Sequence, residues 1–438
     1  MNRVLLAVIL LNALFSCDTE RNIPLPESTV FTKFYGADGE QTGVDLVVTP
    51  DNAIVMVGNS TLPGKLQMIY VVKVDFNGHV IWENMIGQAD KNNTVKDIEL
   101  HPDGRLIIAG ETEMSVGNRD VFVKILNGSG AELDSIRYGL NRYVLQGDEE
   151  VNSISIITQG PAARLGYIVS GSTTDIPFNA AKPNDTKDGL ILRFTDNPLN
   201  ILPNPDWISK GEDDSEDIVV RAIQETANDY YFFGYTNTNR GGSRDFKYWV
   251  FSLNDGGGET NNGIELGAIN EDEKLKVVLN VDTSDPFDRG FLLGGIAIDN
   301  AGNKRSYFVK LKRTLPFNEP SAPSPADALQ VYGFPLGTDG SDKMGGFYNS
   351  FNNDFLILAT QNLSLDLLQD FSLFKLNREV DTIWGPYAFG GESVDEAGNV
   401  IQLPDGTLYM VGTMTVGARN GLKKMALLKL NSEGKLWR

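Results

Sequence analysis

Residues 44–87 read VDLVVTPDNAIVMVGNSTLPGKLQMIYVVKVDFNGHVIWENMIG, and this stretch indicates the architecture of the whole chain. Turn clusters at Pro50-Asp51-Asn52 and Phe76-Asn77-Gly78, with a looser polar loop at 59–65, separate four short apolar runs. The runs are Leu46–Val48, Ile54–Val57, Ile69–Val74 and Val80–Ile86. Runs of this length, rich in β-branched residues and bounded by Pro, Gly, Asn and Asp, are typical of strands joined by turns. The stretch therefore predicts a four-stranded antiparallel meander.

The meander recurs along the chain in seven units. The second strand of each unit ends in a small residue, and the marks lie 52 to 64 residues apart: Gly58, Gly110, Gly171, Gly234, Gly295, Ala359 and Gly412. A second mark, inside the third apolar run, is Lys73, Lys124, Arg193, Ser252, Lys310, Lys375 and Lys429. One meander buries only one face, so such units must pack on their neighbours. Seven four-stranded units predict an all-β fold, a seven-bladed β-propeller.

The two ends of the repeat array complement each other. A complete fourth strand, such as VIWENMIG at 80–87, carries a Trp and closes in Gly, whereas the last unit stops at Trp437-Arg438. The stretch TVFTKFYG at 29–36 resembles the missing second half of that strand. We expect this N-terminal strand to complete the last blade, which closes the ring by hydrogen bonds and removes two open sheet edges.

The first residues form a targeting segment. Arg3 precedes the apolar run Val4–Phe15, which is too short to span a bilayer. Leu14-Phe15-Ser16-Cys17 resembles the lipobox of bacterial lipoproteins, and this resemblance implies that Cys17 becomes the lipidated first residue. Cys17 is the only cysteine, so it has no disulfide partner; the alternative is an ordinary secretory signal with an incidental cysteine. We expect a signal peptide at 1–16, an anchor and polar tether at 17–28, and the propeller at 29–438.

The repeat pattern V-x-K-L-x-x-x-G-x-V-x-W…Y-G resembles the seven-bladed propeller repeats of bacterial secreted proteins. Together with the lipobox, it resembles surface lipoproteins of Bacteroidota, and the acidic start Cys-Asp-Thr-Glu-Arg is similar to their surface-export signal. The resemblance implies a lipid-anchored outer-membrane protein at the cell surface, with the periplasmic leaflet as the alternative. Propellers serve as hydrolases, lyases, dehydrogenases, sugar binders and scaffolds, so the fold alone does not give the function.

Charge excludes one class of partner and indicates one face. The net charge is −20 without any Lys/Arg run, which excludes nucleic acid. The loops that join successive units are acidic and should ring the channel mouth, either as a funnel for a cation, basic peptide or basic protein surface or as simple turn chemistry. The loops between second and third strands lie on the same face and are more basic, and we expect a partner there. The residues predicted for this face are Asp38, Asp148, Asp213, Asp214, Asp272, Asp339, Asp395, Arg240 and Arg244.

Residues suited to metal binding or catalysis are few. Asp282, Asp285 and Asp288 could supply oxygen ligands to Ca²⁺, although the glycine hinge and distal Glu of a known calcium loop are missing; no other cofactor is expected. The only two histidines, His79 and His101, sit in tight turns, where a general base is not expected. The repeated Trp82, Trp384 and Trp437 are interpreted as blade-packing residues rather than as a sugar platform.

These observations favour a non-enzymatic, surface-anchored protein that binds or scaffolds, accessory to an outer-membrane transport or assembly complex. Two alternatives stay open. One is a glycan- or peptide-degrading enzyme that uses carboxylates at the channel mouth. The other is a protein that captures a glycan or peptide ligand for a neighbouring transporter.

Overall fold

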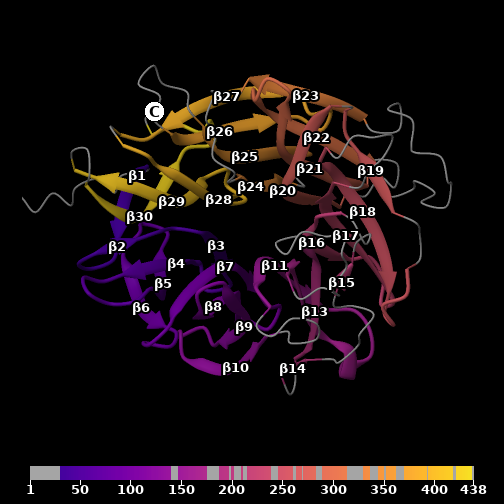
Figure 1. Ribbon diagram of the computed structural model, residues 1–438. Helices are drawn as coiled ribbons and strands as arrows, with labels where there is room; N and C mark the ends of the chain where they lie inside the picture. Colours follow the sequence, from indigo (N-terminus) through magenta and orange to yellow (C-terminus); the bar gives the residue numbers. More distant parts are fainter. Residues whose placement is uncertain are drawn as a thin grey trace, which may run out of the picture.

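The computed structural model describes residues 30–139, 147–174, 187–196, 199–201, 209–210, 215–237, 245–259, 263–268, 270–282, 289–312, 329–335, 344–349, 352–361, 369–391, 393–417 and 421–436. These residues form seven antiparallel sheets around a central channel (Figure 1). The fold is a seven-bladed β-propeller, as the repeats predict. Within these residues no helix is long and apolar enough to cross a membrane.

In blades one to six the strands run outward from the channel in chain order, and in blade seven β1 is added as the outermost strand. Blade one contains β2 (Glu40–Gln41), β3 (Asp45–Thr49), β4 (Ala53–Thr61), β5 (Met68–Asp75) and β6 (Val80–Ile86). Blade two contains β7 (Asn92–Leu100), β8 (Leu106–Ser115), β9 (Asn118–Leu126) and β10 (Glu132–Tyr138). Blade three contains β11 (Glu149–Ile157), a 3₁₀ turn (Ala162–Arg164), β12 (Gly166–Thr173), β13 (Asp188–Thr195), β14 (Asn200–Ile201) and β15 (Ser209–Lys210).

The remaining blades repeat this order. Blade four contains β16 (Asp217–Gln224), β17 (Asp229–Thr236), β18 (Lys247–Asn254) and β19 (Ile264–Leu266). Blade five contains β20 (Glu271–Val281), β21 (Gly290–Asp299), β22 (Lys304–Lys312) and β23 (Leu329–Pro335). Blade six contains β24 (Met344–Asn349), β25 (Asp354–Gln361), β26 (Asp370–Leu376) and β27 (Thr382–Phe389). Blade seven contains β28 (Glu396–Gln402), β29 (Leu408–Val416), β30 (Leu422–Leu430) and β1 (Phe31–Tyr35).

The N-terminal strand closes the ring, as predicted. β1 pairs antiparallel with β30, with Phe31 opposite Lys429 and Tyr35 opposite Met425, and Figure 1 shows the indigo β1 beside the yellow β30. Tyr35 is buried, and its hydroxyl donates a hydrogen bond of 3.0 Å to the carbonyl oxygen of Gly78 in blade one. The last blade is thus completed by the start of the propeller and also packs against its first blade.

The repeated glycine of the second strand has a steric cause. In blades two to five the innermost strand carries one extra residue, a β-bulge, opposite or next to this glycine. A Cβ on Gly110 would lie 2.1 Å from the carbonyl oxygen of Thr94, and a Cβ on Gly234 would lie 2.0 Å from that of Ile218. In blade six, β24 pairs with β25 without a register shift, and there Ala359 takes the place of glycine. The glycine that recurs in the sequence therefore indicates where the innermost strand has its β-bulge.

In blades one, five and seven, the lysine of the third strand ties its blade to the next. Its amino group reaches the turn between the third and fourth strands of the following blade and donates to the carbonyl oxygen of the second turn residue. Such bonds run from Lys73 to Gly128, from Lys310 to Arg378 and from Lys429 to Phe76, at 3.4, 2.9 and 3.0 Å. Lys124 and Lys375 instead pair with Glu132 and Asp354 of their own blades. A buried ammonium is costly unless it is bonded, so the repeated Lys of the first three blades indicates a repeated contact between blades.

The apolar core lies between the blades, in clusters that two neighbouring sheets share. Two of the repeated tryptophans cover the next blade, as predicted. The indole N–H of Trp82 donates to the carbonyl oxygen of Gly128 at 3.2 Å, and its ring lies over Gly130. Trp384 lies in the same way over Gly434. Trp437 lies outside the described residues.

Candidate functional site

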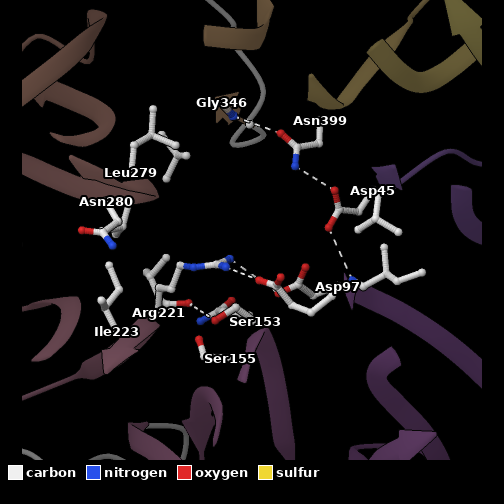
Figure 2. Close-up of a pocket in the computed structure, with 18 of the residues that line it drawn as sticks. Asp45, Asp97, Ser153, Ser155, Arg221, Ile223, Leu279, Asn280, Gly346 and Asn399 are labelled. Carbon is white, nitrogen blue, oxygen red and sulfur yellow. Dashed lines mark hydrogen bonds and ion pairs between the residues drawn. The ribbon is translucent and has the colours of Figure 1, made fainter. Parts of the chain in front are cut away.

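The innermost strands of the seven blades enclose a cavity of about 720 Å³. Its walls come from β3, β7, β11, β16, β20, β24 and β28 and carry both charged and apolar side chains (Figure 2). A cavity of this size lies within the range of small-molecule sites, roughly 300–1,000 Å³. We therefore take the channel as the candidate site.

Asp45 and Asp97 hold neighbouring blades together from inside the channel. Asp45 accepts the backbone N–H of Leu46 at 2.7 Å and that of Ile98, in blade two, at 3.4 Å. Asp97 accepts the backbone N–H of Ile154, in blade three, at 2.9 Å. The two carboxyl groups also influence each other's ionisation. Both side chains are almost fully buried.

The surroundings of these two carboxyl groups favour the protonated form. Burial is the main cause that raises the pKa of Asp45, while its hydrogen bonds oppose the rise. Burial, followed by the charge of Asp45, raises the pKa of Asp97 well above its ordinary value, although Arg221 opposes this. Two like charges in a poorly hydrated site cannot both ionise at low cost. Of the two, Asp97 is therefore the carboxyl group whose protonated form is favoured more strongly.

Arg221 crosses from blade four to blade two. Its guanidinium hydrogen bonds to the Glu99 carboxylate, and Nη1 lies 3.7 Å from Asp97 Oδ2. Burial raises the pKa of Glu99, and Arg221 opposes the rise. Blade three, which lies between, presents the small residues Ser153 and Ser155, whose hydroxyls donate to blade-four carbonyl oxygens at 2.8 and 2.7 Å. Small side chains here leave room for the arginine to pass.

Asn399 extends these contacts to blades six and seven. Its Nδ2 donates to Asp45 Oδ1 at 2.7 Å, and its Oδ1 accepts the backbone N–H of Gly346 at 3.1 Å. Interactions thus connect blades six, seven, one, two and four around the channel (Figure 2). We call this set the channel network: Gly346, Asn399, Asp45, Asp97, Glu99 and Arg221. Ile223 and Leu279 form an apolar wall across the cavity.

On the face that bears the loops between blades, the acidic and basic residues are partners of each other. Arg119, at the start of a third strand, donates to Asp148 and, at 2.6 Å, to Glu150, which also accepts from Lys187 at 2.6 Å. Burial opposes ionisation of Glu150, but the hydrogen bonds from Lys187 and Arg119 lower its pKa to about 2. Similar pairs join Lys247 to Glu273, Arg305 to Glu271 and Lys423 to Glu396. These pairs neutralise part of the predicted acidic funnel.

The other predicted face residues have mixed placements. Asp272 lies within β20 rather than in a loop, because this innermost strand already begins at Glu271, ahead of its β-bulge. The Asp272 carboxylate accepts the backbone N–H of Phe246 at 2.8 Å. Asp395 is buried and accepts the backbone N–H of Thr415 at 2.7 Å. Asp38 is exposed. Apart from Asp38, the predicted face residues that the structure describes thus bond to neighbouring loops and strands. The other predicted face residues, Asp213, Asp214, Asp339, Arg240 and Arg244, lie outside the described residues.

The predicted lipid and calcium sites fall largely outside the described residues as well, since these do not include Cys17, Asp285 or Asp288. Asp282 is described and lies 3.4 Å from Arg289. Among the described residues, no three His, Cys, Asp or Glu side chains are grouped so as to hold a metal ion. The calcium site stays a prediction.

Both histidines lie in turns, as predicted. His79 Nδ1 is 3.0 Å from Asp75, and His101 Nδ1 is 2.7 Å from Asp103. Sequence reasoning did not single out Glu99 and Arg221. A signal was present, because each interrupts the apolar run of a first strand, in VKDIEL at 95–100 and VVRAIQ at 219–224.

Comparison with known proteins gives a likeness of fold alone. No protein-family model matches the sequence, and no curated protein matches it. A protein of unknown function from Dyadobacter fermentans DSM 18053 is 9% identical, with a TM-score of 0.48 over 92% of this chain and 99% of that chain. A Penicillium chrysogenum alpha-L-arabinanase complexed with arabinobiose is 9% identical, with a TM-score of 0.43 over 90% and 98%. A Trypanosoma rangeli sialidase is 8% identical, with a TM-score of 0.42 over 92% and 57%.

Proposed function

We propose that this chain is a non-enzymatic, surface-anchored binding or scaffold lipoprotein, accessory to an outer-membrane transport or assembly complex. Lipid on Cys17 would attach it to the membrane. The observation that carries the non-enzymatic part of the proposal is the channel network, in which each carboxyl group already holds a structural partner. Asp45 and Asp97 hold backbone N–H groups of the next blade, and Glu99 holds Arg221.

A catalytic acid or base has to reach the proton that it transfers. To act on a substrate, Asp45 or Asp97 would have to release the backbone N–H that it accepts from the neighbouring blade. A rigid frame whose channel carboxyl groups already have partners within the protein suits ligand binding better than catalytic turnover.

The expected partner surface is the face that bears the loops between blades. Its described ion pairs, such as that of Arg119 with Asp148, fix the ends of neighbouring strands. Loops held by a rigid scaffold are where binding residues concentrate. Arg240 and Arg244 come between β17 and β18 in the sequence, so they are the first residues to substitute when a partner has been found.

The test is affinity capture of the full-length protein from native membranes in mild detergent. A Cys17→Ala variant, which lacks the acyl attachment point, serves as the matched control. We expect a membrane complex to co-purify with the native protein, with much less in the control. A protein that elutes alone and monodisperse in both cases would contradict the scaffold role.

One observation favours a second candidate, a glycan- or peptide-degrading enzyme. The carboxyl groups of Asp45 and Asp97 line an open cavity and both have a raised pKa, and perturbed carboxyl groups in a cavity are candidates for acid–base catalysis. A turnover screen on polysaccharides and peptides, with Asp97→Asn and Glu99→Gln variants, separates the two functions. Turnover that either variant abolishes would replace the first proposal. The loop variants Asp213→Asn and Asp339→Asn test the channel-mouth acids in the same screen.

A further inference from the structure

We infer that the channel cavity is a binding site for a neutral sugar residue, held between the Glu99–Arg221 pair and the apolar wall of Ile223 and Leu279. The inference rests on the proposed binding function and names the class of ligand. It starts from the mixed lining of one cavity: in Figure 2 the Arg221 side chain reaches toward Asp97, and Leu279 and Ile223 lie on the left with Asn280 between them.

The polar side offers both donors and acceptors to a ligand. Glu99 and Arg221 keep 27% and 32% of their side-chain surface accessible, whereas Asp45 and Asp97 are almost fully buried. The cavity lining also includes Lys96, Lys276, Asn152 and Asn280. Within the Glu99–Arg221 pair, a ligand can meet a carboxylate, which only accepts, and a guanidinium, which only donates. A pair of adjacent sugar hydroxyls can donate to the first and accept from the second.

The opposite side offers a surface for the C–H groups of a sugar ring. Ile223 and Leu279 come from the innermost strands of blades four and five, and Phe347 of blade six lines the same cavity. Leu279 is 8% exposed, so it is fixed by the packing behind it. A sugar ring has a polar rim and less polar faces, which matches a cavity with one side of each kind.

The charge balance of the cavity favours a neutral ligand. The residues that line the cavity include three carboxyl groups, those of Asp45, Asp97 and Glu99, and three basic groups, those of Lys96, Arg221 and Lys276. Their formal charges cancel. A multiply charged ligand would leave unpaired charge in a poorly hydrated site, which is costly. A neutral polyhydroxyl ligand can replace water at the Glu99–Arg221 pair without that cost.

The experiment uses the purified mature propeller and a panel of neutral mono- to tetrasaccharides, with spermidine and arginine methyl ester as cationic probes. Saturation-transfer NMR and calorimetry measure binding. Leu279→Trp fills the cavity from its apolar side, and Glu99→Gln changes the polar side at constant shape. Val116→Trp is the control, because Val116 is 97% exposed in a turn of blade two. Circular dichroism establishes that each variant is folded.

We expect at least one neutral saccharide to bind and its affinity to fall at least tenfold in Leu279→Trp and in Glu99→Gln, with no change in Val116→Trp. If Leu279→Trp does not fold, Glu99→Gln alone carries the test. Binding of the cationic probes only, binding that survives both channel variants, or no binding across the panel would overturn the inference. Co-purification of a membrane partner is measured separately, so the scaffold role can stand while the sugar site fails. Saccharide binding accompanied by turnover would keep the site and reject the non-enzymatic function.

Discussion

Asp45 and Asp97 lie on adjacent blades, and each carboxyl group accepts a backbone N–H of the next blade. Burial raises the pKa of both groups above the ordinary carboxyl value of 3.8 that they have in the unfolded chain. A group whose folded pKa is raised makes the free energy of unfolding fall as the pH rises above the unfolded value. The contact between blades one and two is thus strongest in acid.

The first prediction concerns the raised pKa of Asp97. Asp97→Asn should keep the contact between blades two and three, because the amide oxygen can still accept the backbone N–H of Ile154, but the amide does not titrate. We expect the stability of the native protein to fall, relative to that of the variant, as the pH rises from about 4. Urea unfolding at a series of pH values measures the difference. Parallel pH profiles would show that the pKa of Asp97 is not raised in the folded protein.

The second prediction concerns Glu273, which is fully buried beside Lys247. Burial raises its pKa from 4.5 to about 7, even though Lys247 opposes the rise. The raised pKa of Glu273 adds to the free energy of unfolding below pH 4.5. This addition is lost as the pH rises to about 7, and the free energy of unfolding falls by about 1.4 kcal/mol per pH unit. Glu273→Gln should remove that slope from the unfolding free energy, while Glu40→Gln, at an exposed site, should leave it unchanged.

The third prediction tests the cause of the repeated glycine. Gly110→Ala places a methyl group against the carbonyl oxygen of Thr94, and such overpacking costs about 1–3 kcal/mol. The reverse change in the blade without a bulge, Ala359→Gly, should cost only about 1 kcal/mol. Chemical denaturation of the two variants gives the comparison. Equal costs would mean that the bulge does not select the glycine.

The fourth prediction concerns the basic residue of the third strand. Lys310→Met keeps the length of the side chain but removes the donor that the Arg378 carbonyl oxygen accepts at 2.9 Å. The loss should cost about 1–3 kcal/mol, because a part-buried carbonyl loses its partner. Lys312→Met, two residues further along the same strand at an exposed position, is the matched control. A similar cost at both positions would reject the tie between blades.

The fifth prediction concerns ring closure. A protein that starts at residue 37 lacks β1, whereas one that starts at residue 29 retains it. Loss of the buried Tyr35 side chain alone should cost about 3–5 kcal/mol, and the freed edge of β30 should promote association. Thermal melting and light scattering of the two proteins measure these effects. Identical melting would rule out a structural role for the N-terminal strand.

The sequence predicts the fold well because the marks of the repeat come from backbone contacts that every blade repeats. Gly110 and its equivalents recur since the bulge recurs, and Tyr35 lies in a strand fragment that complements the last unit. The candidate site, in contrast, depends on contacts between residues of different blades, and these contacts leave no pattern within a single repeat. Arg221 meets Glu99 only because the ring brings blade four near blade two, and this depends on curvature and on small residues in between. Likewise, Arg119 belongs to the basic loops and Asp148 to the acidic loops in the sequence, and only the folded ring shows that the two residues bond to each other.

The pairing of β1 with β30 also sets an order of events during synthesis. Of the described strands, β1 is made first and its partner β30 last, so β1 must wait unpaired while every intervening sheet forms. The outer edge of blade seven stays open during the same period. Contacts between distant parts of a chain form slowly because long loops must close first. The last step of maturation is therefore the meeting of the two ends of the propeller, and any factor that protects β1 until then would raise the yield of folded protein.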